Sequence, residues 1–223
     1  MRRHFTLHTV AVNIAIVLTG LASCDSHEAV DASIYVGHVL CADHRTMSIE
    51  QYEGQHETEA VAVVFAEADN DHPALAVMLN SISDCPFADS LGTSLGTSGA
   101  IDKFDGYTNT VAMMNNRTSN GYGSPLADFV FRNHKYGQSD YIPSVAEMRL
   151  LVLSKNKVND IIRRCGGELL SEAPDSTCWY WTSTEVKENI ANQAWLCSMA
   201  TGGIQQTPKD EVHPARAIVA LYY

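Results

Sequence analysis

The hydrophobic periodicity of this chain changes twice along its length, and this constrains the fold more than any other feature. Apolar runs of strand length come first, at 34–40, 61–66 and 74–79, separated by acidic, turn-rich stretches. Helical spacing follows, and strand-like alternation returns near the C-terminus. Strands at both ends with helices between them predict a single α+β domain over residues 34–223, with a mixed or antiparallel sheet and roughly two to four helices.

The central helices carry recognisable end signals. Ser144-Val145-Ala146-Glu147 is a capping box, and an apolar stripe continues from it to Cys165, where Gly166-Gly167 ends the helix. Earlier helices are predicted at 107–116 and 125–136, the second with Pro125 at its first position. Later strands are predicted at 178–184, 193–200 and 216–223.

The N-terminal residues have the organisation of a bacterial lipoprotein signal peptide over residues 1–23. Arg2 and Arg3 precede a short apolar run at 10–18, and Leu21-Ala22-Ser23 leads into Cys24. Cleavage before Cys24 leaves that cysteine as the site of lipidation, and the polar residues 24–33 then form a flexible tether. The alternative is an ordinary cleaved secretory signal followed by a chance cysteine.

The chain is acidic, and its charge restricts its partners. The formal net charge is −11, and removal of the signal peptide removes two arginines but no acidic residue. Such a chain is unsuited to nucleic acid or to anionic lipid headgroups, which attract Lys and Arg. Membrane attachment must therefore come from acyl chains on Cys24, two or three of which suffice for stable anchoring. We expect an outer-membrane lipoprotein on the periplasmic face or the cell surface. Lipoprotein sorting systems differ in how they treat an aspartate directly after the acylated cysteine, so Asp25 does not decide between the two faces.

Five cysteines remain after Cys24, which is an odd number. An oxidising envelope permits up to two disulfides and one free thiol, and a Cys165–Cys178 bridge would close a short loop. The alternative is that most of them are buried free thiols that pack as small apolar side chains. Their spacing matches no zinc motif. The five are Cys41, Cys85, Cys165, Cys178 and Cys197.

Motifs for catalysis and metal binding are weak. Gly92-Thr93-Ser94-Leu95-Gly96 matches the nucleophile-elbow pattern, but the small residues of 90–99 predict a surface loop rather than a strand–turn–helix. The acidic residues at 69–72 and around Asp102 lack the loop of a calcium-binding EF-hand and are expected to be solvated turns. We therefore expect no catalytic residues, no resident metal and no cofactor.

Several short motifs resemble, in order and spacing, the DUF1566 or Lcl C-terminal family. They are Asp105-Gly106-Tyr107-Thr108-Asn109-Thr110, Tyr141-Ile142-Pro143-Ser144 with Glu147, Tyr180-Trp181-Thr182-Ser183-Thr184-Glu185, Ala194-Trp195 and Ala215-Arg216-Ala217. The resemblance covers about half of the chain. It implies a C-type-lectin-like fold related to formylglycine-generating enzymes, although the cysteine setting and the Arg-Gly-Gly-Ser-Trp-like segment of those enzymes are missing.

The motif residues are expected to be mainly structural. Trp181 shares a strand face with Trp179, and both, like Trp195, are expected in the core rather than in an aromatic platform for sugar rings. Arg216 is expected to pair with Glu147 or Glu185 and so to hold the closing strand.

These observations predict a non-catalytic binding or adhesin-like display module held on the envelope by lipid. Its partner is a glycan or a protein, bound on loops at 185–193 and 205–213. The alternatives are a structural or accessory subunit of a surface appendage or envelope complex, a diversity-generating-retroelement target, and an enzyme. The predicted ligand contacts are Glu185, Lys187, Asn192, Gln205, Gln206 and Lys209.

Overall fold

The computed structural model of the chain describes residues 33–55, 57–118, 121–134, 140–171 and 173–222. The predicted signal peptide, Cys24 and the tether up to residue 32 lie outside the described residues. Residues from Ser33 onward form one compact unit of antiparallel sheets and four α-helices, so the α+β class is confirmed. The helices are α1 (Ile49–Glu53), α2 (Gly106–Asn115), α3 (Pro125–Arg132) and α4 (Val145–Arg164).

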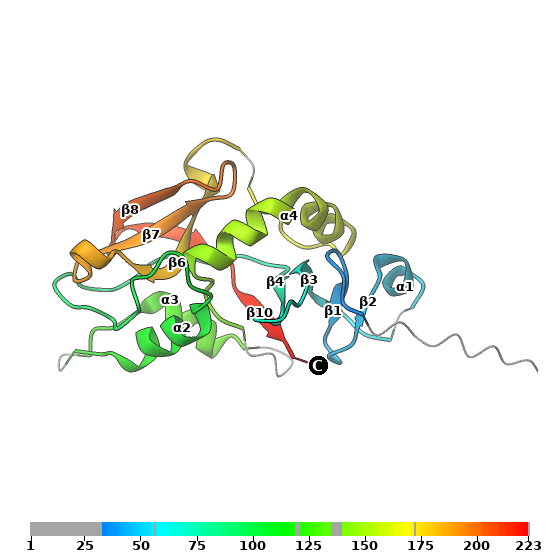
Figure 1. Ribbon diagram of the computed structural model, residues 1–223, viewed down its shortest axis with the longest axis horizontal. Coiled ribbons are helices and arrows are strands. Elements are labelled where there is room, and N and C mark those ends of the chain that lie inside the picture. The colour runs from blue at the N-terminus through cyan, green and yellow to red at the C-terminus, as the bar shows by residue number, and fades with distance from the viewer. Residues whose placement is uncertain (1–32, 56, 119–120, 135–139, 172, 223) are drawn as a thin grey trace, which may run out of the picture. The chain divides into compact units, whose positions relative to one another are not determined.

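A five-stranded antiparallel sheet joins strands from the two ends of this unit (Figure 1). Val77 of β4 lies opposite Val63 of β3 on one side and Ile218 of β10 on the other, and Val63 also pairs with Val39 of β1. The strand order is β10 (Ile218–Leu221), β4 (Ala74–Met78), β3 (Ala60–Ala66), β1 (Val39–Cys41) and β2 (Thr46–Met47).

Helix α4 begins and ends where the sequence predicts. Ser144 and Glu147 form the capping box, and Gly166 follows the helix with a positive φ of 72°. Apolar side chains on one face of the helix, including Leu151 and Ile162, pack with Phe65 in a buried cluster. This cluster fixes α4 across the five-stranded sheet.

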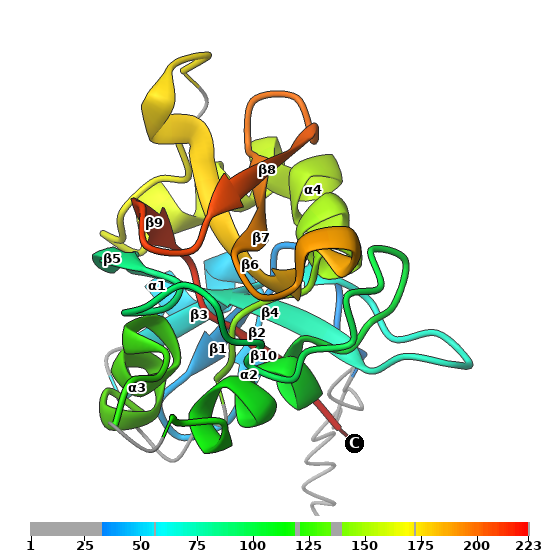
Figure 2. The same cartoon turned by 90° about the vertical axis from the view of Figure 1, so that its left-hand side faces the viewer.

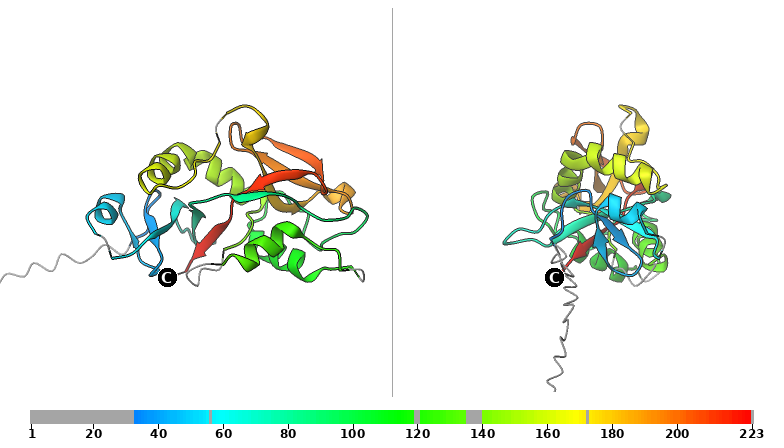
Figure 3. Two further views of the ribbon diagram at one scale, coloured as in Figure 1. Left: turned by 180° about the vertical axis from the view of Figure 1, so that it is seen from behind. Right: turned by 90° about the vertical axis from the view of Figure 1, so that its right-hand side faces the viewer.

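Two smaller sheets and two helices form the rest of the domain (Figure 2). Helix α2 contacts β6, and α3 contacts β5. The left view of Figure 3 shows the two helices, in green, below the orange strands. Trp181 of β6 is fully buried among apolar side chains from α2 and α3, which include Met113 and Leu126. The strands are β6 (Trp179–Glu185), β7 (Gln193–Ser198) and β8 (Ile204–Pro208) in one sheet, and β5 (Ile82–Pro86) and β9 (Val212–Ala215) in the other.

Several element boundaries differ from the sequence prediction. The first strand begins at Val39 rather than residue 34, because the chain turns at Gly37, whose φ is 92°. The helix predicted at 125–136 ends early, at Arg132. Short elements that the periodicity did not predict are α1, β2, β5, β8 and β9.

The segment 90–99 is a loop without regular secondary structure, as predicted, but the expectation that it lies entirely on the surface is wrong. Leu95 and Thr97 are only 3% and 5% exposed. Backbone and side-chain hydrogen bonds to Glu185 hold them against the end of β6.

The five described cysteines are free thiols, so the Cys165–Cys178 bridge is absent. Cys41, Cys178 and Cys197 are buried, as the alternative of apolar packing predicts. None of the helices in the described ranges is long and apolar enough to cross a membrane.

Candidate functional site

Two of the six predicted ligand contacts are not on the surface at all. Glu185, at the end of β6, and Lys209, directly after β8, are each 0% exposed and form an ion pair with one another. The prediction that they face solvent is therefore wrong. Charged side chains are usually solvated, and that expectation fails where a charged pair is fully enclosed.

The hydrogen bonds around this Glu185–Lys209 pair explain how the domain tolerates two buried charges. Lys209 Nζ also donates to the carbonyl oxygens of Ile190 at 2.6 Å and Thr93 at 3.0 Å. The Glu185 carboxylate accepts from the Leu95 amide at 2.7 Å and from the Thr97 amide and hydroxyl, each at 3.1 Å. Burial lowers the pKa of Lys209, and Glu185 beside it acts in the opposite direction. The pair is a structural element that ties segment 93–97 to the end of β6.

The other four predicted contacts are more accessible than Glu185 and Lys209. Lys187, Gln205 and Gln206 are exposed, whereas Asn192 is half-buried and accepts a hydrogen bond from the Gly92 amide at 3.1 Å. The predicted open loop 205–213 contains most of β8 and the start of β9, so most of its backbone is paired in sheets. None of the four lines either cavity described below.

The tryptophans divide between core and surface. Trp181 is fully buried and donates from its indole nitrogen to the Cys85 carbonyl at 3.0 Å, so the prediction of a core role is confirmed. Trp179 is half-buried against the same cluster. Trp195 is also half-buried, on the face of β7 opposite to that of Ala194, so its predicted core role is only partly right.

Arg216 does not pair with Glu147 or Glu185, which corrects the predicted role. It is fully buried, and its guanidinium donates to the carbonyl oxygens of Met78, at 3.2 Å, and of Glu168. The arginine therefore does hold the closing strand, but through backbone carbonyls rather than through a carboxylate.

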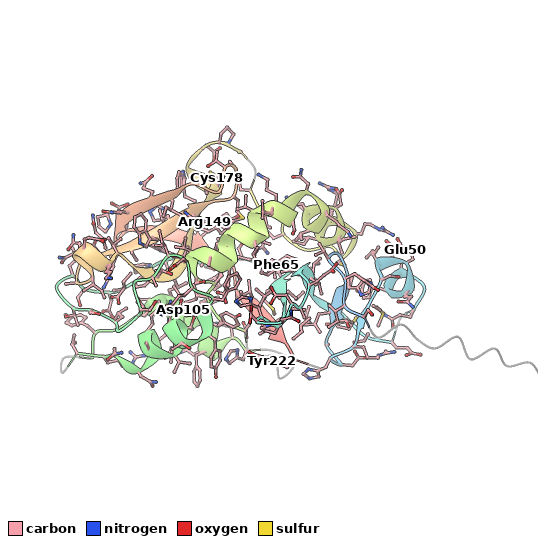
Figure 4. All side chains as sticks on the ribbon, viewed as in Figure 1. Glu50, Phe65, Asp105, Arg149, Cys178 and Tyr222 are labelled. Atoms are coloured by element: carbon pink, nitrogen blue, oxygen red, sulfur yellow. The ribbon has the colours of Figure 1, made fainter. Side chains whose placement is uncertain are left out.

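Glu147, in the first turn of α4, lies near Asp105, which precedes α2; Figure 4 labels Asp105. Its carboxylate accepts from the Ser144 amide at 2.7 Å and from the Tyr141 hydroxyl at 3.2 Å, and burial raises its pKa. A Cβ atom added to Gly106 would lie 2.2 Å from Glu147 Oε2 and 2.7 Å from the Ile142 carbonyl oxygen, so only glycine fits here.

The Pro143 carbonyl accepts a hydrogen bond from the Ser183 amide of β6 at 2.8 Å. The motif residues from Asp105 to Glu147 thus hold α2, α4 and β6 together, as predicted for structural residues.

A groove lies between α2 and α3 on the surface of the domain. One face of α2 lines it with residues spaced three and four apart, among them Tyr107, Val111 and Met114. Val130 and Phe131 come from α3. The volume is about 250 Å³. We call this cavity the α2–α3 groove.

Large apolar side chains stand exposed around the α2–α3 groove. Phe131 is 63% exposed, Tyr107 is 57% exposed and Val111 is 40% exposed. Isolated exposed apolar residues are ordinary on a protein surface, but a contiguous group around a cavity marks a binding site. The sequence could not reveal this group, because a stripe at helical spacing is equally the signature of a core-facing helix.

A few polar groups lie among the apolar ones in the α2–α3 groove. His134 Nδ1 is hydrogen-bonded to Asp140 Oδ1, and the Asp140 side chain is 8% exposed. The ring of Tyr141 packs edge-on against Tyr107, with centroids 5.8 Å apart. An apolar pocket with a small number of placed polar groups is the usual composition of a ligand site.

The geometry offers no support for the nucleophile-elbow motif. Ser94 Oγ donates to Glu185 Oε2 at 3.2 Å and accepts from the Gly96 amide at 3.0 Å. Between the end of β5 at Pro86 and the start of α2 at Gly106 there is neither strand nor helix, whereas an elbow requires both around the serine. Within the described residues, no group of three or more His, Cys, Asp or Glu side chains is placed to hold a metal ion.

Comparisons with known proteins provide no family assignment. No protein-family model matches the chain, and no curated protein matches it. The functional interpretation therefore depends on the geometry of the domain.

Proposed function

We propose that this protein is a lipid-anchored, non-catalytic binding module of the cell envelope, which engages a protein partner through the α2–α3 groove. The observation that carries the proposal is the group of exposed apolar side chains, Tyr107, Val111 and Phe131, around one cavity. Burial of a large apolar side chain contributes about 1.5–3 kcal/mol, so these side chains supply substantial binding free energy only when a partner covers them.

The composition of the α2–α3 groove favours a protein partner. Aromatic side chains are enriched among the residues that dominate protein–protein binding energy, and they cluster near the centre of such interfaces. A cavity of about 250 Å³ accommodates one or two apolar side chains of a partner beside Phe131. The His134–Asp140 pair at its edge adds a polar contact that orients the partner.

An array of host and envelope proteins, probed with the full chain in detergent, tests the proposal. The variant Phe131→Ser with Tyr107→Ser should lose at least tenfold in affinity for any protein bound. Leu153→Ser is the matched control, because Leu153 is 83% exposed on α4 and lies outside the groove. Equal binding by the wild type, the groove double variant and Leu153→Ser would show that the groove is not the interface. Absence of binding to every arrayed protein would show the same.

Lipidation at Cys24 is proposed together with an outer-membrane location. The acidic composition supports acyl anchoring over electrostatic adsorption. Cys24→Ala should abolish lipid labelling and release the protein from membranes, whereas Cys85→Ala should leave both unchanged. Membrane attachment of Cys24→Ala would refute the anchor.

We also propose that the domain is a divergent relative of the DUF1566 or Lcl family with a C-type-lectin-like fold. Two observations support this relationship. The closing strand β10 and the early strands β1, β3 and β4 share one sheet. The motif residues Gly106, Glu147 and Trp181 are buried contacts between elements rather than surface residues. An experimental structure that superimposes poorly on lectin-like domains would refute the relationship.

A further inference from the structure

A second cavity, of about 490 Å³, lies between the β5–β9 ribbon and the segment that follows α4. We call it the β5–β9 cleft; the two strands lie beside one another in Figure 2. Its lining shares no residue with the α2–α3 groove. The two cavities can therefore be altered independently.

One part of the β5–β9 cleft is rich in hydrogen-bonding groups. Thr177 Oγ1 donates to Asp175 Oδ1 at 2.6 Å and lies 2.7 Å from Ser171 Oγ. Since the Thr177 proton is used by Asp175, Ser171 must donate to Thr177, which leaves the lone pairs of Ser171 Oγ as acceptors. Glu168 Oε2 accepts from the Ser81 amide at 3.0 Å, so its second carboxylate oxygen remains for another donor.

Asp84 adds a second carboxylate to the lining and is exposed on β5. The lining also contains the hydroxyl of Ser83 and the imidazole of His213, whose ring packs edge-on against Trp181 at 5.2 Å. This contact holds the His213 ring in place. The cleft therefore offers acceptors and donors on a supported framework.

The other part of the β5–β9 cleft is apolar. Ile82 and Tyr180 are 5% and 3% exposed, whereas Leu169 and Val212 are 39% and 58% exposed. The lining thus combines apolar side chains with carboxylates and hydroxyls. A sugar ring has the same division, with C–H groups on its faces and hydroxyl groups around its edge.

The charges of the β5–β9 cleft define which sugars fit. Among the described residues, two carboxylates line it, and no lysine or arginine does. The whole chain is also strongly acidic. The carboxylates would therefore repel sulfate, phosphate or sialic acid groups. The hydroxyl groups of a neutral sugar, in contrast, can donate hydrogen bonds to Asp84 and Glu168.

We propose that the β5–β9 cleft is a binding site for a neutral saccharide. Asp84, Glu168 and Ser171 accept hydrogen bonds from the sugar hydroxyl groups, and Val212 with Leu169 covers an apolar face of the ring. This site is separate from the α2–α3 groove and does not depend on the function proposed for that groove.

Saturation-transfer NMR and calorimetry on the full chain in detergent test this site. The probes are neutral oligosaccharides of glucose, galactose, mannose and N-acetylglucosamine, together with sulfated and sialylated counterparts. Asp84→Ala and Val212→Asp should each weaken binding of a neutral sugar about tenfold or more. Asp102→Ala is the matched control, since Asp102 is exposed and lies outside the cleft.

The expected result is binding of at least one neutral saccharide, weakened by both cleft variants and unchanged by Asp102→Ala and by Phe131→Ser. Failure of every neutral probe to bind overturns the proposal, as does preference for the anionic counterparts. Binding that survives both cleft variants, or that is lost with Phe131→Ser, also overturns it, because the sugar would then lie elsewhere.

Discussion

The Glu185–Lys209 pair provides the sharpest test of how this domain is held together. The variant Lys209→Met replaces the side chain by an unbranched apolar one that is one atom shorter, and it removes the charge and the hydrogen bonds to Glu185, Thr93 and Ile190. Removing one partner of a buried ion pair costs about 3–5 kcal/mol, because the other charge stays buried without compensation. Glu185 keeps its hydrogen bonds from Leu95 and Thr97. We therefore expect a loss near the lower end, about 3 kcal/mol.

Urea unfolding followed by tryptophan fluorescence measures this loss, since Trp181 is fully buried. With a slope of about 2 kcal/mol per M, a loss of 3 kcal/mol lowers the unfolding midpoint by roughly 1.5 M. Lys187→Met is the control; Lys187 is exposed, and the change should stay within about 0.5 kcal/mol. In the double variant Lys209→Met with Glu185→Gln, neither position carries a charge, so its loss should be smaller than the sum of the two single losses.

Two results would refute this reasoning. A Lys209→Met midpoint no lower than that of Lys187→Met would mean that the pair contributes no stability in the folded domain. Additive losses in the double variant would mean that Glu185 and Lys209 act separately.

Three further predictions follow from buried groups. Burial raises the pKa of Glu147 above its ordinary value of 4.5. Between the pKa of the unfolded chain and that of the folded state, the folded state therefore holds a proton that the unfolded chain has released. The free energy of unfolding falls as pH rises through this range. Chemical denaturation from about pH 4 to pH 7 should show this fall in the wild type and a smaller one in Glu147→Gln; identical slopes contradict it. Gly106→Ala should destabilise the domain by about 1–3 kcal/mol in urea, because its Cβ would clash with Glu147 and backbone, whereas Gly54→Ala, whose Cβ has ordinary clearance, should change little. Finally, iodoacetamide at neutral pH should label the cysteine thiols of the folded protein slowly. It should label those of the unfolded protein fully without reductant, and a need for reductant would reveal disulfides. The thiols concerned have pKa values raised by burial to about 11, and they are Cys41, Cys85, Cys165 and Cys197.

The sequence predicts those parts of the fold that local chemistry determines. The capping box of Ser144 and Glu147 locates the start of α4, and the glycines after Cys165 locate its end, because both signals act within a few residues. The apolar runs at 61–66 and 74–79 correspond closely to β3 and β4 for the same reason. Short strands such as β5 and β9 escape prediction, since their pairing partners lie far away along the chain.

Contacts between distant segments explain the errors at the candidate site. Glu185 receives hydrogen bonds from Thr97, 88 residues earlier, and Lys209 reaches Thr93, 116 residues earlier. No local pattern distinguishes such a buried charge from a solvated one. The general preference of Glu and Lys for solvent therefore gives the wrong answer at both positions.

In the α2–α3 groove, likewise, the sequence alone does not distinguish exposed apolar side chains from buried ones. Tyr107 and Val111 have the helical spacing of core residues, and Phe131 lies in an apolar helix, but whether they meet another element depends on how α2 and α3 pack. Their exposure contributes little to the stability of the isolated domain, since most of their surface stays in water. Leu153 is more exposed still, yet it stands outside both cavities and requires no explanation. Exposure alone therefore does not identify an interface, and the role proposed for the α2–α3 groove depends on the convergence of exposed apolar side chains on one cavity.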